Sequence, residues 1–170
     1  PANPSDGVHH GGTLTLIDEK SATIKNTKTH DSGALEVTID WMGTDYRLLN
    51  IYAPAKPLQR VKFYENFRKY LEEDIIAGGD WNVVPDVLLD VQSSNPLNYE
   101  NNGAALLEQA TNGCKLWDFR RDQLEGEFEA TRIGNNRNGA TATRIDRVYV
   151  PTIDRMNHLL WSFEIEENFT

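Results

Sequence analysis

The 170-residue sequence predicts an α/β fold in a single domain, long enough to bury a core. Three observations predict it. Short apolar segments separated by turn residues fill the first third of the chain, a helix-spaced apolar stripe follows, and a β-branched run then ends in two glycines. Strands that alternate with helices in this way are typical of a sheet covered by helices.

The first third is predicted to form an antiparallel meander. Strands are expected at 13–17, 22–29, 35–41 and 46–53. Clusters of Asp, Gly, Ser and Thr favour turns between them, at 18–20, 31–33 and 43–44. Residues 1–11 are polar and Gly-rich, and we expect them to form a flexible lead.

The strongest helix prediction covers residues 57–73. Pro57 suits a first helical turn, and the apolar residues recur at helical spacing. This aromatic stripe is interpreted as core and not as a nucleic-acid platform; it consists of Val61, Phe63, Tyr64, Phe67, Tyr70 and Leu71.

The sequence patterns of the remaining elements are less regular. Helices are expected at 103–112 and 117–124, and strands near 128–132, 141–150 and 159–165. The stretch 85–101 is rich in Pro, Asn and Ser and is expected to be irregular. Within it, Asp86 and Asp90 are either acids that support a nearby site or ordinary solvated loop residues.

The segment 75–84, Ile-Ile-Ala-Gly-Gly-Asp-Trp-Asn-Val-Val, is the most informative in the chain. A buried strand here would deliver Asp80 and Asn82 to its carboxyl end, where open α/β sheets place ligand clefts. Its two glycines allow a tight turn and a close backbone approach. Period-two geometry would put both polar side chains on one face and Trp81 on the other. Such a pair can orient water, hold a phosphate oxygen or share a hard cation; the alternative is an ordinary Asp/Asn turn.

Two further segments place polar side chains in or at the ends of strands. The strand that ends at Pro54 should bring Tyr52 near Asp80. There its phenol could donate to a phosphate oxygen; the alternative is an ordinary buried sheet tyrosine. The segment 143–150 alternates, with Arg144 and Asp146 on one face. An aspartate inside a strand is disfavoured and needs a reason, for which a structural salt bridge would be enough.

These three segments resemble the endonuclease/exonuclease/phosphatase superfamily, most closely the endonuclease domains of LINE-type (non-LTR) retrotransposons. The matching motifs are NIYAP at 50–54, GGDWN at 78–82 and RIDRVYV at 144–150, in the family's order and spacing. Weaker agreement comes from GGTLTL at 11–16 and FEAT at 128–131. The resemblance covers nearly the whole chain and implies a two-sheet α/β sandwich of the DNase I-like type.

The resemblance also implies roles for the matching residues. Asp80 would position or deprotonate the attacking water, and Asn82 would hold that water or the scissile phosphate. Tyr52 would contact the phosphate, and Asp146 would orient a catalytic histidine. Asp80 and Asn82 would be weak ligands for the Mg²⁺ or Mn²⁺ cofactor, and Thr131 would contact DNA.

The sequence departs from the family's pattern at both ends. The Gln-Glu whose glutamate is the main Mg²⁺ ligand should precede Gly12, and the closing Ser-Asp-His should follow a segment like 159–163; neither motif occurs. We therefore expect a domain clipped at both ends that lacks outer strands. The four histidines (His9, His10, His30 and His158) are interpreted as exposed and non-catalytic.

The charge balance constrains the partners. A net charge of −9 is unfavourable for DNA binding, because Lys and Arg supply most of the affinity for the duplex. One basic cluster exists between 132 and 147, where Asp146 is the single acid: Arg132, Arg137, Arg144 and Arg147. The Gly- and Asn-rich stretch within it is predicted to be a hairpin tip. The resemblance places 134–139 in the DNA minor groove; the alternative is a surface hairpin with solvated arginines.

We therefore expect weak, salt-sensitive DNA binding. The candidate DNA-binding residues are Thr131, Arg132, Asn136, Arg137 and Arg144. The single Cys114 excludes an intramolecular disulfide and suits a reducing compartment. No apolar run approaches the length of a membrane span and no signal segment is visible, which argues against a membrane or secreted protein. The resemblance implies an intracellular, nuclear location and possible partners within a larger polyprotein.

Three functions remain open. The first is a Mg²⁺-dependent phosphodiesterase that nicks DNA for a retrotransposon. Its activity in these residues should be weak, because loss of an acid–base histidine alone costs about 10²–10⁴ in rate. The second is a non-catalytic, domesticated or excised remnant that binds DNA or protein. The third is a phosphatase of the same superfamily.

Overall fold

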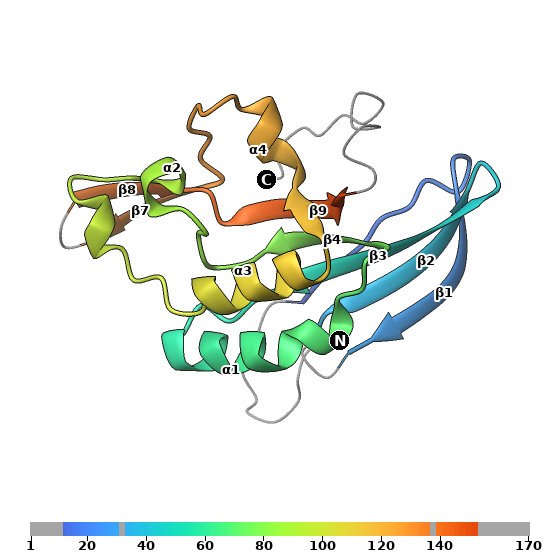
Figure 1. Cartoon of the computed structure of the whole chain (residues 1–170). Helices are drawn as coiled ribbons and strands as arrows, with labels where there is room; N and C mark the ends of the chain where they lie inside the picture. The colour runs from blue at the N-terminus through green and yellow to red at the C-terminus, as the bar shows by residue number, and fades with distance from the viewer. Residues whose placement is uncertain (1–11, 31–32, 137–138, 153–170) are drawn as a thin grey trace.

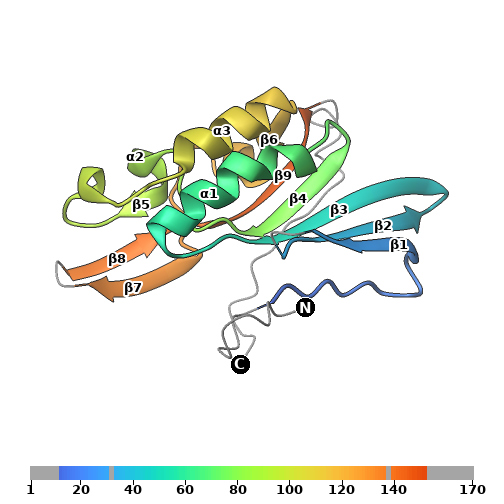
Figure 2. The same ribbon diagram turned by 90° about the horizontal axis from the view of Figure 1, so that it is seen from below.

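The computed structural model describes residues 12–30, 33–136 and 139–152. These residues form a six-stranded sheet in the order β1-β2-β3-β4-β9-β6 and a three-stranded sheet in the order β5-β8-β7. Helices α1 and α3 lie side by side over one face of the larger sheet (Figures 1 and 2). The smaller sheet lies beside α2, beyond the end of β4 (Figure 1). The predicted α/β architecture with two sheets is confirmed.

The elements follow one another in this order: β1 (Thr23–Thr29), β2 (Leu35–Trp41), β3 (Thr44–Tyr52), α1 (Pro57–Phe67), η1 (Arg68–Tyr70), β4 (Ile75–Asp80), α2 (Val87–Asp90), β5 (Val91–Gln92), η2 (Pro96–Asn98), α3 (Ala104–Gly113), β6 (Leu116–Asp118), α4 (Phe119–Gln123), β7 (Arg132–Asn136), β8 (Gly139–Thr143) and β9 (Asp146–Pro151).

Strands β1, β2 and β3 form the predicted antiparallel meander. Strand β4 then pairs parallel with β3, and α1 makes the crossover between them. Residues 13–17, predicted as a strand, form none: a side chain holds this segment, since Asn50 Nδ2 donates to the carbonyl of Leu14 at 2.8 Å. The predicted strand 159–165 and the expected lead 1–11 lie outside the described residues.

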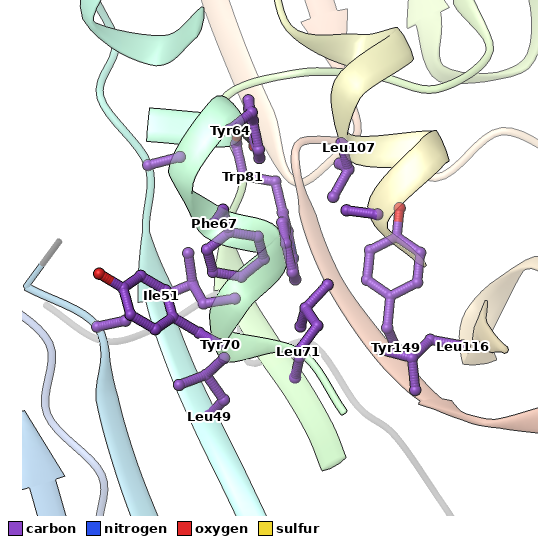
Figure 3. Packing of buried hydrophobic residues seen from close by; sticks show 14 of the residues in the cluster. Leu49, Ile51, Tyr64, Phe67, Tyr70, Leu71, Trp81, Leu107, Leu116 and Tyr149 are labelled. Carbon is purple, nitrogen blue, oxygen red and sulfur yellow. Dashed lines mark hydrogen bonds between the residues drawn. The ribbon is translucent and has the colours of Figure 1, made fainter. Parts of the chain in front are cut away.

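The aromatic stripe of α1 forms the core between helices and sheet (Figure 3). Phe63, Tyr64 and Phe67 are buried, which confirms the interpretation of the stripe. Trp81, fully buried, packs edge-on against Phe67 at 5.6 Å and Tyr149 at 4.9 Å between ring centroids. Such edge-to-face contacts stabilise a core beyond the area they bury. The helix ends at Phe67 and continues as a single 3₁₀ turn, so it is shorter than predicted.

The predicted strand 141–150 is interrupted. Strand β8 ends at Thr143 in the smaller sheet, and β9 begins at Asp146 in the larger one, so the chain changes sheets at residues 144–145. Local hydrogen bonds replace the ladder there: the Arg144 amide donates to the Asp90 carbonyl at 3.0 Å, and the Ile145 amide donates to Thr131 Oγ1 at 3.0 Å. Alternation along the sequence cannot reveal a change of sheet.

The predicted helix 117–124 is also divided, into the short strand β6 and the helix α4. Strand β6 pairs with β9 and closes one edge of the larger sheet. Over the ranges that the structure describes, no helix has the length and apolar character that crossing a bilayer requires.

Candidate functional site

Three neighbouring strands bring Tyr52, Asp80 and Asp146 into one row across the larger sheet. Tyr52 on β3 is the register partner of Asp80 on β4, and Asp80 is the partner of Asp146 on β9. Register partners on adjacent strands point to the same face. Because Ile75 and Ala77 point into the core under the helices, the alternation of β4 turns Asp80 to the opposite face. Of the expected convergence of a phenol, a carboxamide and two acids, the strand register brings together the phenol and the two acids.

Gly79 makes this row possible. Its φ is +135°, and a Cβ built on it would lie 2.0 Å from the carbonyl oxygen of Ile51. Any side chain would therefore push β4 away from β3, immediately before Asp80. The close backbone approach at Gly79 is to the neighbouring strand β3, and an approach to a ligand stays a prediction.

The prediction that Asn82 shares a face of the sheet with Asp80 is wrong. The strand ends at Asp80, and Asn82 has a left-handed φ of +51° and is 5% exposed. Its Nδ2 donates to the Ala53 carbonyl at 2.7 Å, and its amide donates to Asp80 Oδ1 at 2.8 Å. The prediction failed because the extended backbone ends at Asp80, two residues before Asn82, so the alternation of a strand does not apply to Asn82.

Asp80 lies in an environment that favours its neutral form. Burial, supported by the nearby Asp146 carboxylate, raises the pKa of Asp80 to about 6, against the opposing effects of the Asn82 amide and the Arg132 guanidinium. A carboxyl with such a pKa exchanges its proton near neutral pH, as a general base must.

The two flanking residues differ in accessibility. Tyr52 is 46% exposed, so its hydroxyl is accessible to a ligand. Asp146 is partly exposed, and its amide donates to Thr131 Oγ1 at 3.0 Å. Since the same oxygen accepts from the Ile145 amide, Thr131 fixes the start of β9 at the site.

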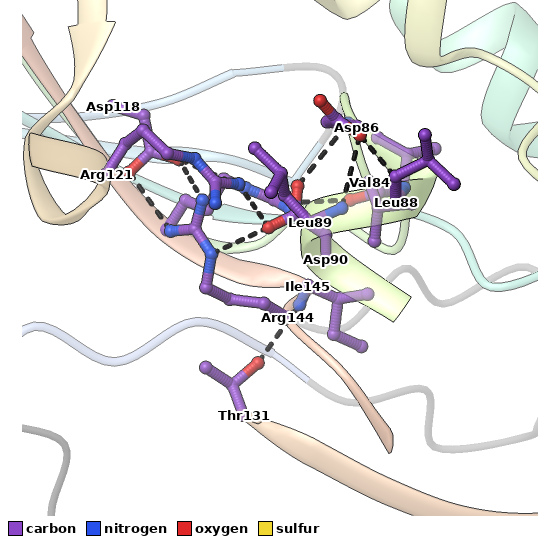
Figure 4. Close-up of polar contacts among 12 residues, drawn as sticks. Val84, Asp86, Leu88, Leu89, Asp90, Asp118, Arg121, Thr131, Arg144 and Ile145 are labelled. Carbon is purple, nitrogen blue, oxygen red and sulfur yellow. Dashed lines mark hydrogen bonds and ion pairs between the residues drawn. The ribbon is translucent and has the colours of Figure 1, made fainter. Parts of the chain in front are cut away.

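The basic cluster predicted for DNA is divided by the fold. Arg144 is 1% exposed; its Nε lies 2.9 Å from Asp90 Oδ1 and its Nη2 lies 2.5 Å from Asp118 Oδ2 (Figure 4). Arg147, also 1% exposed, has Nη2 2.9 Å from Asp90 Oδ2. The prediction that Arg144 contacts DNA is therefore wrong, because buried carboxylates that are distant in sequence occupy its guanidinium.

Asp90 belongs to this buried cluster and is not a solvated loop residue. Burial alone would raise its pKa, but the guanidinium groups of Arg147, Arg144 and Arg121 outweigh this effect and lower the pKa of Asp90. Asp86 instead caps α2, accepting hydrogen bonds from the amides of Leu88 and Leu89.

The predicted hairpin is present as β7 and β8, and Arg132 lies exposed on β7. Asn136 ends β7, whereas Arg137 lies outside the described residues. The contact of Arg132 and Thr131 with DNA stays a prediction.

Sequence reasoning missed three residues that hold the segment after Asp80: Tyr64, Asn101 and Arg147. Each donates a side-chain hydrogen bond to a backbone carbonyl of that segment. No local signal distinguishes them, since Tyr64 belongs to a core stripe and Asn101 to an Asn-rich loop.

The donor set for a divalent cation is incomplete. Among the residues for which the structure gives positions, no group of three or more His, Cys, Asp or Glu side chains could hold a metal. Asp80 and Asn82 alone do not fit a Mg²⁺ site, because hard cations take several oxygen ligands.

Comparisons with known proteins found one relative by sequence and several by fold. No family model matches the chain. It is similar to an uncharacterized 149 kDa protein of transposon TX1 from Xenopus laevis, with 25% identity over 146 residues, 82% of this chain and 11% of that protein. The chain therefore spans a small part of that relative.

The solved structures are more distant in sequence. The endonuclease domain of TRAS1, a telomere-specific non-LTR retrotransposon, matches with a TM-score of 0.53 and 15% identity, over 84% of this chain and 60% of that domain. D. rerio TDP2 complexed with a single-strand DNA product matches with a TM-score of 0.48 and 14% identity, over 78% of this chain and 54% of that one, which is too low to support an inference. The fold that the resemblance implied, a two-sheet α/β sandwich of the DNase I-like type, is thus confirmed: the chain has the fold of the TRAS1 endonuclease domain.

Proposed function

We propose that this chain is a phosphodiesterase domain of the retrotransposon-endonuclease type, which nicks DNA with Asp80 as the base. The observation that carries the proposal is the row of Tyr52, Asp80 and Asp146, in which the pKa of Asp80 is raised to about 6. A phenol donor beside a carboxylate that titrates near neutrality suits attack of water on a phosphodiester.

In the proposed reaction, Asp80 accepts a proton from a water molecule whose oxygen forms a bond to phosphorus. The bond from phosphorus to the 3′ oxygen breaks, and solvent supplies the proton to that oxygen. Tyr52 donates a hydrogen bond to a phosphate oxygen. Burial, supported by the Asp146 carboxylate, keeps the pKa of Asp80 raised, and Asn82, which is buried and hydrogen-bonded to Asp80, acts by positioning that carboxylate.

The resemblance implies Mg²⁺ or Mn²⁺ as cofactor, and such an ion stabilises charge on the phosphate in reactions of this class. Because the described residues supply too few ligands, we expect weak nicking by these 170 residues. Weak activity is also expected from the charge of −9, which disfavours the duplex.

Partners and location follow from the same proposal. DNA would be bound weakly, through Arg132, Thr131 and the β7–β8 hairpin, and the domain would act in the nucleus as part of a larger polyprotein. The transposon relative, of which this chain spans 11%, supports the last point.

A nicking assay on supercoiled plasmid with Mg²⁺ or Mn²⁺, from pH 5 to 8, tests the proposal. We expect slow nicking whose rate rises about tenfold per pH unit up to about pH 6, as the pKa of Asp80 requires. Asp80→Asn keeps the acceptor for the Asn82 amide but removes the base, so nicking should be lost. The matched control is Asp74→Asn, an exposed carboxylate that pairs with Arg47. Equal nicking by Asp80→Asn and wild type would contradict the proposal.

One observation favours a second candidate, a non-catalytic module that binds DNA or protein. Asn82 is 5% exposed and its Nδ2 donates to the Ala53 carbonyl, so little of this side chain is accessible to a substrate. Folded protein that binds duplex but never nicks it would support this candidate. Release of phosphate from a nucleotide or an inositol phosphate, without nicking, would instead favour a phosphatase of the superfamily.

A further inference from the structure

The segment that follows Asp80 is buried without belonging to a helix or strand. We name Trp81, Asn82, Val83 and Val84 the 81–84 loop; three of these residues are 0% exposed and Asn82 is 5% exposed. Buried backbone amides and carbonyls destabilise a fold unless they are hydrogen-bonded. Side chains from elsewhere in the chain must therefore replace the missing ladder.

Two of these side chains come from α1 and β9. The hydroxyl of Tyr64 donates to the Trp81 carbonyl at 2.5 Å, and Arg147 Nη1 donates to the Val83 carbonyl at 2.7 Å. In return, the indole of Trp81 donates to the Arg147 carbonyl at 3.0 Å. The start of the 81–84 loop is thus tied to α1 and to β9.

The third side chain, Asn101, holds the end of the loop with two hydrogen bonds. Its Oδ1 accepts from the Val84 amide at 2.9 Å, and its Nδ2 donates to the Val84 carbonyl at 2.5 Å. This reciprocal pair imitates the bonds of a neighbouring strand. One carboxamide therefore replaces a ladder partner for Val84.

Asn101 itself lies in a segment that is fixed against α1. Arg60, 5% exposed, donates from Nε to the Asn102 carbonyl at 2.8 Å. Gly103 has a φ of +101°, and a Cβ there would lie 2.7 Å from the ring of Tyr64. The position of Asn101 is set by these contacts, so it can serve as an anchor for the loop.

The 81–84 loop connects Asn101 to the candidate site through Asn82. Asn82, two residues before Val84, donates its amide to Asp80 Oδ1 at 2.8 Å and its side chain to Ala53 at 2.7 Å, next to Tyr52. We propose that Asn101 is a positioning residue that fixes the carboxylate of Asp80 through the 81–84 loop. Its effect on catalysis rests on the proposed function, whereas its effect on Asp80 does not.

The test compares Asn101→Ala with Asn102→Ala in the 170-residue chain. Asn102 is the adjacent asparagine, exposed, and its side chain donates to Glu100 at 3.4 Å, away from the loop. NMR titration gives the pKa of Asp80, hydrogen exchange gives the protection of the Asn82 and Val84 amides, and plasmid nicking gives activity.

For Asn101→Ala we expect water to enter the loop and the pKa of Asp80 to fall towards its ordinary value, because burial is the largest cause that raises it. Exchange protection of both amides should be lost while global unfolding stays cooperative, and nicking should fall about tenfold from misplacement of the base. Asn102→Ala should leave the pKa, the protection and the nicking unchanged.

An unchanged pKa of Asp80 and unchanged amide protection in Asn101→Ala would overturn the proposal, whatever the activity. If the wild type does not nick DNA, the proposed function fails, but the titration and exchange still decide the role of Asn101. Should Asn101→Ala fail to fold, Asn101→Ser, which retains one hydroxyl for Val84, replaces it under the same criteria.

Discussion

The fold surrounds two pairs of acids, Asp90 with Asp118 and Asp80 with Asp146, in opposite ways. Asp90 and Asp118 are paired with the buried guanidinium groups of Arg144 and Arg147. Asp80 and Asp146 face each other across β4 and β9 with the exposed Arg132 as a nearby cation. The pKa of Asp90 is lowered, whereas that of Asp80 is raised to about 6.

The opposite pKa shifts of Asp90 and Asp80 distinguish a structural role from a chemical one. A carboxylate held by several arginines stays ionised and cannot take up a proton near neutral pH. A half-buried carboxylate beside another acid can do so, at a cost in stability. The fold therefore places its arginines where they hold strands together, and it leaves the candidate base without a direct cation.

The largest expected effect comes from breaking the paired cluster. Asp90→Ala leaves three guanidinium groups without their shared partner, and it should lower the free energy of unfolding by about 3–5 kcal/mol. Urea denaturation at pH 7 measures it. The matched control is Asp86→Ala, which removes the cap of α2 four residues away and should cost about 1 kcal/mol.

The pH dependence of this effect has a definite sign. Because the folded pKa of Asp90 is lowered, its contribution is present above the ordinary carboxyl range and is lost as pH falls through the folded value. Similar losses for Asp86→Ala and Asp90→Ala would contradict the distinction between the clusters.

The second effect has the opposite sign. Asp80→Asn should raise the free energy of unfolding by about 1–2 kcal/mol above pH 6, after allowance for the partial exposure of the carboxylate. Since the pKa of Asp80 is raised in the folded state, its carboxyl is neutral below about pH 4, and the wild-type protein loses stability as the pH rises from there towards about 6.

Thermal or urea unfolding of both proteins at several pH values measures this difference. It should vanish below about pH 4 and reach its full size above the folded pKa. A variant that is less stable than wild type at pH 7 would show that Asp80 is compensated in a way the contacts do not reveal.

The smallest effect on stability is expected at the exposed arginine. Arg132→Ala should change the free energy of unfolding by less than about 0.5 kcal/mol, because Arg132 is exposed. If Arg132 contacts a phosphate, the salt-dependence slope of duplex binding should fall by about 1. Fluorescence anisotropy at several salt concentrations measures the slope, and Lys28→Ala on the exposed strand β1 is the control. An equal slope for both variants would remove Arg132 from the DNA surface.

Much of the fold was predictable because its signals are local. Strand alternation, the aromatic stripe of α1 and the turn residues all act within a few positions, and they placed β2, β3, β4 and the start of α1 correctly. The positions of Tyr52 and Asp80 were also predictable, since each lies at a strand end that its own sequence marks, whereas Asp146 was expected inside a strand that the fold interrupts.

The partners of the polar side chains were not predictable in the same way. Arg144 looked basic and available, yet its acid Asp90 is 54 positions away. Asn82 looked like a strand residue, yet contacts with Ala53, 29 positions away, turn it inward. The sheet change at Arg144 and Ile145 likewise depends on Thr131 and Asp90, which no periodicity marks.

By itself the sequence determined most of the elements, their periodicity and the strand ends at which Tyr52 and Asp80 stand, because backbone geometry and burial patterns act locally. The tertiary structure alone decided which carboxylates pair with arginines and which residues form hydrogen bonds to the 81–84 loop. The physical reason is that charge pairing and buried hydrogen bonds depend on distances between segments that only the folded chain brings together.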